Sequence, residues 1–109
     1  MSKISTHVLD AVLGKPAVGV GVRLDAAQGD GWINLAAGAT DADGRCRCFA
    51  ENVEEGIYRL TFITGSYLES KGRSTIYPEI AITFFCDGSE HYHLPLLLSD
   101  NSYTTYRGS

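Results

Sequence analysis

The three histidines of this sequence are the side chains best suited to acid–base chemistry. His7 lies in THVLD, and His91 and His93 are two residues apart in HYHLPLLLS. Side chains two residues apart on a β-strand point to the same side, so His91 and His93 share the side opposite Tyr92 and three leucines. A neutral imidazole on a rigid strand can act as a general base or a proton shuttle. A surface histidine on the outer side of a sheet is the alternative interpretation of His93.

The His-x-His pattern is also compatible with a metal site. His91 and His93 could supply two ligands, with the third from His7 or from a carboxylate. No acidic residue stands at a motif-like spacing from these histidines, so the sequence predicts no metal site.

Two arginines could bind a carboxylate or a polarised carbonyl, because a guanidinium is a planar set of donors. Arg45 follows the turn DADG, and Arg107 lies in the final segment TTYRGS. Each is equally compatible with a solvated arginine. The sequence has no phosphate-binding glycine loop and no G-x-S-x-G nucleophile motif. Spacing alone therefore does not establish a site.

The elements that must position these side chains are short strands. Alternation of apolar and polar residues and turn-forming segments predict eight of them, at residues 5–13, 18–24, 32–40, 45–49, 56–64, 79–86, 91–99 and 102–107. In the second strand Val18 is expected to share the buried face with Val20 and Val22. This number of strands at this spacing is typical of a β-sandwich.

Two local features complete the prediction of elements. One short helix is expected at residues 65–72, with Ser66 as its N-cap and Gly72 as its stop. Pro95 lies inside a predicted strand and lacks a backbone donor, so that strand must be locally unpaired, bulged or at an edge.

Length and composition indicate one domain over residues 1–109. The formal net charge is −4 and no cluster of Lys and Arg occurs, which argues against nucleic-acid binding. The apolar runs are too short to span a membrane, and no secretory leader is visible. An odd number of cysteines (Cys46, Cys48 and Cys86) is expected to remain as free thiols in a reducing compartment. A cytoplasmic location is therefore expected.

Five segments occur in an order that resembles a known family. They are THVLDAVLGKPA, TDADGRC, YPEIAITF, HYHLPLLLS and the terminal YRGS. The resemblance is to the transthyretin-related family, and it runs from about Ile4 to Ser109. The YRGS tail separates the enzyme branch of this family from its hormone-carrier branch. The turn SDNSY and Thr104, where serine is more usual, depart from the family pattern without touching its catalytic set.

The resemblance implies a fold and an assembly. The fold is an all-β, transthyretin-like sandwich of two four-stranded sheets, with a short helix between the fifth and sixth strands. The assembly is a homotetramer, a dimer of dimers, in which more than one subunit lines each of two clefts. The outer side of the HYHLPLLLS strand would then be a cleft wall.

The resemblance also implies an activity, the hydrolysis of 5-hydroxyisourate in urate degradation, with no metal or organic cofactor. The family's catalytic set corresponds to His7, Arg45, His93 and Ser109. The substrate-binding residues would be His7, Arg45, Ser109 and two residues of the tail, Tyr106 and Arg107, which anchor Ser109. His91 receives no catalytic role, and the choice between His7 and His93 as general base stays open. A carrier of a hydrophobic ligand and a purely structural sandwich are the rival hypotheses.

Overall fold

The computed structural model describes residues 2–89 and 91–108, apart from the side chains of residues 47 and 48. Within this part of the chain the elements are β1 (Ser2–Asp10), β2 (Lys15–Pro16), β3 (Gly21–Gln28), β4 (Gly31–Ala39), β5 (Arg45–Val53), β6 (Gly56–Ile63), α1 (Thr64–Ser70), β7 (Ile80–Cys86), β8 (His91–Leu98) and β9 (Tyr103–Thr105).

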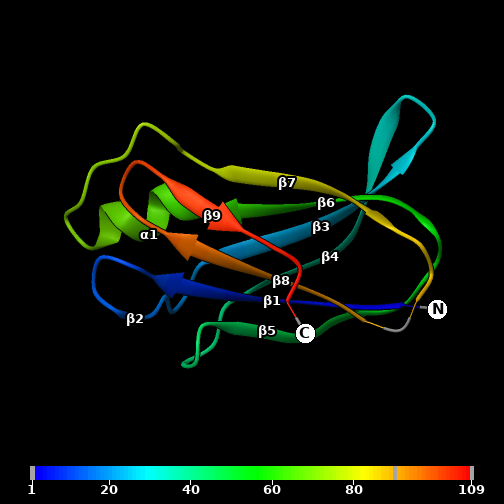
Figure 1. The fold of residues 1–109 in the computed structure, drawn as a ribbon. Coiled ribbons are helices and arrows are strands. Elements are labelled where there is room, and N and C mark those ends of the chain that lie inside the picture. The colour runs from blue at the N-terminus through cyan, green and yellow to red at the C-terminus, as the bar shows by residue number, and fades with distance from the viewer. Residues whose placement is uncertain (1, 90, 109) are drawn as a thin grey trace.

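The strands form two sheets that pack against each other (Figure 1). In the first sheet the order is β2-β1-β8-β9, and β5 also pairs with β1. In the second sheet the order is β4-β3-β6-β7. The pair β1 and β8 runs parallel, whereas the other pairs are antiparallel. This arrangement confirms the predicted sandwich with one short helix, and the two-residue strand β2 is an addition to the expected four-stranded sheet.

Apolar side chains from both sheets fill the space between them. The fully buried ones include Ile4, Val8, Leu96 and Leu98 from the first sheet and Val22, Leu24, Leu60 and Phe62 from the second. Burying one such side chain contributes roughly 1.5–3 kcal/mol relative to leaving it exposed. Burial alternates along β1 and, except at the buried Pro95, along β8, so the three histidines lie on the outer side of the first sheet.

Besides the final strand, which ends at Thr105 and not at Arg107, three local predictions are wrong. Val18 precedes β3 and is 51% exposed. The segment 11–13 is a turn and not a strand, because the carboxylate of Asp10 accepts hydrogen bonds from the backbone N–H groups that follow it. Ser66 is not the N-cap, since Ile63 precedes the helix and no side chain caps it. Gly72, with a φ of +71°, does follow the helix as expected.

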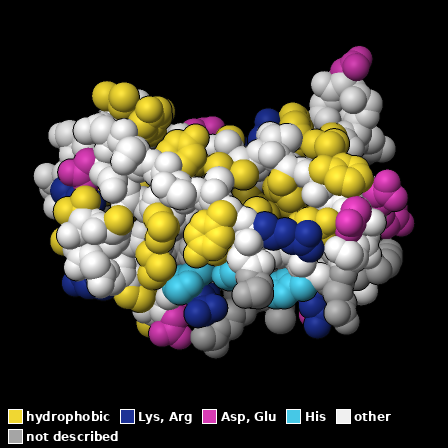
Figure 2. Space-filling model, viewed as in Figure 1, with side chains coloured by type: hydrophobic (Ala, Val, Ile, Leu, Met, Phe, Trp, Pro, Cys, Tyr) yellow, Lys and Arg dark blue, Asp and Glu magenta, His cyan; other side chains and the backbone are white. Residues whose placement is uncertain are grey.

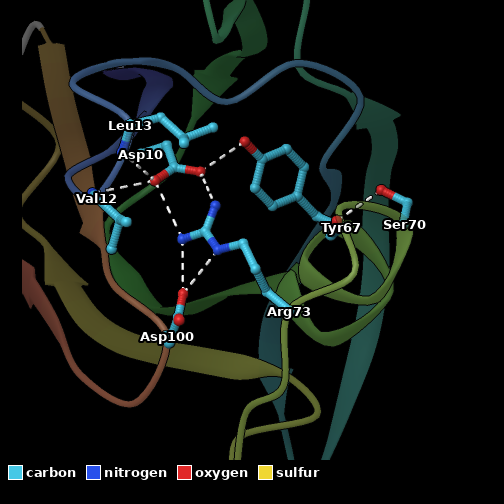
Figure 3. Close-up of polar contacts among 7 residues, drawn as sticks. All are labelled: Asp10, Val12, Leu13, Tyr67, Ser70, Arg73 and Asp100. Atoms are coloured by element: carbon cyan, nitrogen blue, oxygen red, sulfur yellow. Dashed lines mark hydrogen bonds and ion pairs between the residues drawn. The ribbon is translucent and has the colours of Figure 1, made fainter.

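Arg73, which follows α1, ties together the ends of β1 and β8 (Figure 3). Its two terminal nitrogens donate to the carboxylate of Asp10 at the end of β1, over 2.5 and 3.2 Å. Its Nε donates to Oδ1 of Asp100, two residues beyond β8, over 2.8 Å. The hydroxyl of Tyr67 on α1 donates to the same Asp10 carboxylate over 2.8 Å. This cluster, the Asp10–Arg73 clamp, fixes one end of the two strands that carry the histidines.

Candidate active site

His7 and Arg45 lie side by side on adjacent strands. They are direct partners in the antiparallel register of β1 and β5. The turn before β5 is closed by Asp41, whose carboxylate accepts a hydrogen bond from the N–H of Arg45 over 2.9 Å. Gly44 in this turn has a φ of +78°, and a Cβ there would collide with the carbonyl oxygen of Val8. Only glycine lets the turn approach β1 so closely, and the turn fixes where β5 begins.

Hydrogen bonding determines which nitrogen of His7 is available. Nε2 of His7 lies 2.8 Å from the carbonyl oxygen of Asp43. A carbonyl oxygen only accepts, so Nε2–H donates and Nδ1 is the acceptor that a neutral His7 offers. Arg45 adds a guanidinium, a planar set of hydrogen-bond donors, beside His7.

His93 lies on β8 and is half-buried, with its Nδ1 2.8 Å from the hydroxyl of Ser5. Burial is the largest cause that lowers the pKa of His93, and electrostatic interactions with His91, Arg45 and His7 lower it further. Both effects disfavour the imidazolium. His93 is therefore neutral near pH 7, which is the state that can accept a proton.

Pro95 creates the gap in which the tail meets β8. On one side of the gap Thr105 pairs with Leu96, and on the other Gly108 pairs with His93. Pro95 has no N–H to offer the tail, so the ladder is interrupted between these two pairs. The sequence-based expectation of a locally unpaired strand is thus confirmed, although β8 lies between β1 and β9 and not at an edge.

The tail is held against β8 by three contacts. The N–H of Gly108 donates to the carbonyl of His93 over 2.7 Å. The Arg107 guanidinium lies over the ring of Tyr92, 4.0 Å from its centre, and donates to the carbonyl of His91 over 3.2 Å. A Cβ on Gly108 would lie 2.9 Å from Cδ2 of His93, so a larger residue would require the His93 ring to shift.

These segments enclose one surface hollow of about 520 Å³, which we call the histidine hollow. It is lined by His7, Leu9, Arg45, His93, Pro95, Tyr106, Arg107 and Gly108. The histidine side chains gather on one face of the molecule, next to Lys and Arg side chains (Figure 2). The hollow thus offers two imidazoles and two guanidinium groups, a set suited to activating water and stabilising an oxyanion.

A second hollow of about 590 Å³ lies where β3 and β4 meet β5 and β6. Among the side chains that the structure describes, its lining includes Glu51, Glu54 and Glu55 but no histidine or arginine. The histidine hollow, which combines both residue types, is therefore the better candidate site.

Most of the site residues expected from the sequence come together in the histidine hollow. His7, Arg45, His93, Tyr106 and Arg107 all line it. Ser109 lies outside the described residues. His91 is exposed and lies beyond the lining of the hollow.

One residue with a direct contact to a site histidine escapes sequence reasoning, namely Ser5. Its spacing of two residues from His7 places both on one side of β1, and this is the one local signal that could have pointed to it. The parallel pairing that sets Ser5 opposite His93 is a long-range feature that no local pattern reveals.

Other sequence-based expectations concern metals, cysteines and membranes. Among the described residues no group of three or more His, Cys, Asp or Glu side chains could hold a metal ion. Cys46 and Cys86 are buried free thiols, whereas the side chain of Cys48 lies outside the described part. In the part of the chain that the structure describes, no helix is long and apolar enough to cross a membrane.

Comparison with known proteins places the chain in a family. The model of the HIUase/Transthyretin family matches residues 4–108. The 5-hydroxyisourate hydrolase of Salmonella typhimurium is 47% identical over 97% of this chain and 80% of its own length. The chain belongs to the HIUase/Transthyretin family, as the sequence motifs predicted. Because curated 5-hydroxyisourate hydrolases are 38% to 47% identical to it over nearly its whole length, the chain is an enzyme of the hydrolase class.

Solved structures agree with this assignment. The 5-hydroxyisourate hydrolase of Klebsiella pneumoniae superposes with a TM-score of 0.91 at 39% identity, over the whole of both chains. The transthyretin of Sparus aurata superposes with a TM-score of 0.93 at 33% identity, over 97% of this chain and 96% of that one. Because the two solved proteins share one fold, the fold alone does not determine which of the two activities a chain has.

Proposed function

We propose that this protein hydrolyses 5-hydroxyisourate to 2-oxo-4-hydroxy-4-carboxy-5-ureidoimidazoline, a step of urate degradation. The observation that carries the proposal is the histidine hollow, where His7, Arg45 and His93 from three strands meet the tail. Relatives named for this activity, matching nearly the whole chain, support it. A carrier of a hydrophobic ligand would have no use for this set of polar side chains.

His93 is the better candidate for the general base. Its Nδ1 is engaged by Ser5, which leaves Nε2 for a water molecule, and its lowered pKa keeps the ring neutral. The reaction then begins with attack of water on a ring carbonyl carbon as Nε2 of His93 takes a proton from that water. His7, whose Nε2–H is held by a backbone carbonyl, orients the substrate with its Nδ1.

Arg45 stabilises the oxyanion in this proposal. Negative charge grows on the carbonyl oxygen as water attacks, and a fixed guanidinium can donate two hydrogen bonds to it. When the intermediate collapses, the bond between carbon and ring nitrogen breaks. The leaving nitrogen takes the proton from the histidine, which returns to its neutral state, so no cofactor is needed.

The tail completes the site in the same proposal. Arg107 and Gly108 fix the backbone of the tail against β8, and Tyr106 lines the histidine hollow. The hydroxyl of Ser109 would then reach the substrate or the attacking water. A homotetramer, with more than one subunit around each cleft, and a cytoplasmic location belong to this proposal as well.

Single substitutions test the assignment. Rates are measured by stopped-flow ultraviolet decay of freshly made 5-hydroxyisourate. The wild-type protein should accelerate the decay, and His93→Asn should lower kcat by roughly 10²–10⁴, as loss of a general base does. Lys15→Gln, a charge change on the exposed strand β2, is the control and should keep the wild-type rate.

Two results would count against this account. A folded wild-type protein that leaves the decay unchanged would exclude the hydrolase and favour a carrier. If His7→Asn lost the rate expected for a missing base while His93→Asn kept its own, the roles of the two histidines would be exchanged.

A further inference from the structure

Ser5 joins the two histidines of β8. Its Oγ lies 2.8 Å from Nδ1 of His93 and 2.8 Å from Nε2 of His91. Ser5 is the direct partner of His93 in the parallel register of β1 and β8, so one hydroxyl bridges two rings whose centres are 6.2 Å apart. This serine contacts both histidines from a neighbouring strand, and the mechanism above gives His91 no task.

A serine hydroxyl carries one proton, and this couples the states of the two rings. If Ser5 donates to His91, it must accept from Nδ1–H of His93, and Nε2 of His93 is then bare. If Ser5 donates to His93 instead, Nε2 of His93 carries the proton and cannot act as a base. The arrangement that supports catalysis is therefore the one in which Ser5 donates to His91.

His93, Ser5 and His91 form a hydrogen-bonded row that runs from the histidine hollow to solvent. His93 is half-buried and lines the hollow, whereas His91 is exposed. On the hollow side the neighbouring charged or titratable groups are His7 and Arg45. On the solvent side Lys3 is the register partner of His91, and the side chain of Arg107 donates to the His91 carbonyl. A positive charge at His93 would stand beside Arg45, and a charge at His91 would be hydrated.

We infer that Ser5 is a positioning residue that sets the tautomer of His93 and passes its proton to His91. The inference rests on the proposed function. As Nε2 of His93 takes a proton from the attacking water, its Nδ1–H proton passes to Oγ of Ser5, and the Ser5 proton passes to Nε2 of His91. The result is hydroxide bonded to the substrate carbon, a neutral His93 and an imidazolium at His91. Reverse transfer delivers the proton to the leaving ring nitrogen, and no electrons are gained or lost.

Kinetics of three serine variants test the inference. Ser5→Ala should lower kcat about tenfold to 100-fold with KM little changed, the usual loss when the partner that orients a histidine is removed. Ser5→Thr keeps the hydroxyl on a strand and should retain the wild-type kcat. Ser70→Ala is the matched control, because it also removes a hydroxyl that donates one hydrogen bond, here to the carbonyl of Tyr67 in α1.

A second pair of variants tests the path beyond Ser5. His91→Gln removes the proton acceptor at the exposed end and should lower kcat as Ser5→Ala does. The double variant Ser5→Ala/His91→Gln should be no slower than either single variant, because the effects of substitutions on residues that act as one unit do not add. Additive losses, or a His91→Gln variant with full kcat, would overturn the transfer to His91.

Nitrogen chemical shifts of the histidine rings give a readout that does not depend on activity. In the wild-type protein Nδ1 of His93 should carry the proton, and in Ser5→Ala both tautomers should be present. If Ser5→Ala keeps both the wild-type tautomer and the wild-type kcat, the inference is wrong. If the wild-type protein does not turn over 5-hydroxyisourate, the proposed function fails, and the shifts still decide whether Ser5 couples the two rings.

Discussion

At the residue scale, the pKa of His93 determines the pH range in which the enzyme works. Burial, together with electrostatic interactions with His91, Arg45 and His7, holds this pKa below its ordinary value of 6.5. The active form is the neutral base, which is lost as the pH falls through the pKa. A plot of kcat/KM against pH should therefore have its acidic limb below pH 6.5, because this quantity reports the free enzyme.

Arg45→Gln tests the cause of that shift. Removing one positive neighbour should raise the pKa of His93 and move the acidic limb to higher pH, in addition to lowering the rate. Lys15→Gln, at a residue outside the lining of the histidine hollow, should leave the acidic limb of the pH profile in place. A wild-type limb at or above pH 6.5 would contradict the assignment of His93 as the base.

The sequence was sufficient to predict which residues form the site, but not which side chains hydrogen-bond to them. His7, Arg45 and His93 were predicted from their chemistry together with the resemblance to a family, and they do line one hollow. The bridge through Ser5 was missed, because it depends on the pairing of β1 with β8, which are separated by most of the chain. The part played by Ser109 stays a prediction.

At the element scale, the Asp10–Arg73 clamp holds the ends of β1 and β8. Burial on its own raises the pKa of Asp10, but hydrogen bonds from Arg73, Leu13 and Tyr67 outweigh it and lower that pKa to about 2. Asp10→Asn leaves the Arg73 guanidinium, whose side chain is only 14% exposed, without its buried partner. Urea unfolding should show a loss of about 3 kcal/mol in the free energy of unfolding at pH 7.

The pH dependence of this loss has a definite sign. The pKa of Asp10 is lower in the folded state than its ordinary value of 3.8, so its stabilising effect is complete above pH 3.8. The difference between the wild-type protein and Asp10→Asn should shrink as the pH falls from about 4 toward 2. Asp100→Asn, at a carboxylate that is 39% exposed, is the control and should cost less than about 1 kcal/mol. Equal losses in the two variants would show that burial does not strengthen the clamp.

Element types followed from the sequence better than element ends did. The alternating segments became strands, and Gly72 followed the helix, because these depend on local patterns. The predictions for residues 11–13 and for Val18 were wrong for different reasons. The carboxylate of Asp10 accepts hydrogen bonds from the backbone of residues 12 and 13, which turns the chain there. Val18 lies before β3 begins. The tail was predicted as a strand to Arg107, but β9 ends at Thr105, where the chain reaches Pro95.

At the scale of the whole molecule, the proposed activity depends on a tail that returns to the sheet. After β9 the chain crosses back over β8 and reaches the histidine hollow through Tyr106, Arg107 and Gly108 (Figure 1). The same fold occurs in a solved transthyretin, so overall shape does not determine the activity. What we propose as decisive is the meeting of this tail with His7, Arg45 and His93.

The most direct measurement compares the intact protein with a variant that lacks residues 106–109, using stopped-flow decay of 5-hydroxyisourate. Sedimentation must first show that both have the same assembly, so that loss of the tail is the only difference. We predict rapid decay with the intact protein and a rate at least about 10²-fold lower without the tail, since misplacing a positioned group costs that much. Undiminished activity of the truncated variant, or no activity of the intact protein, would contradict the account.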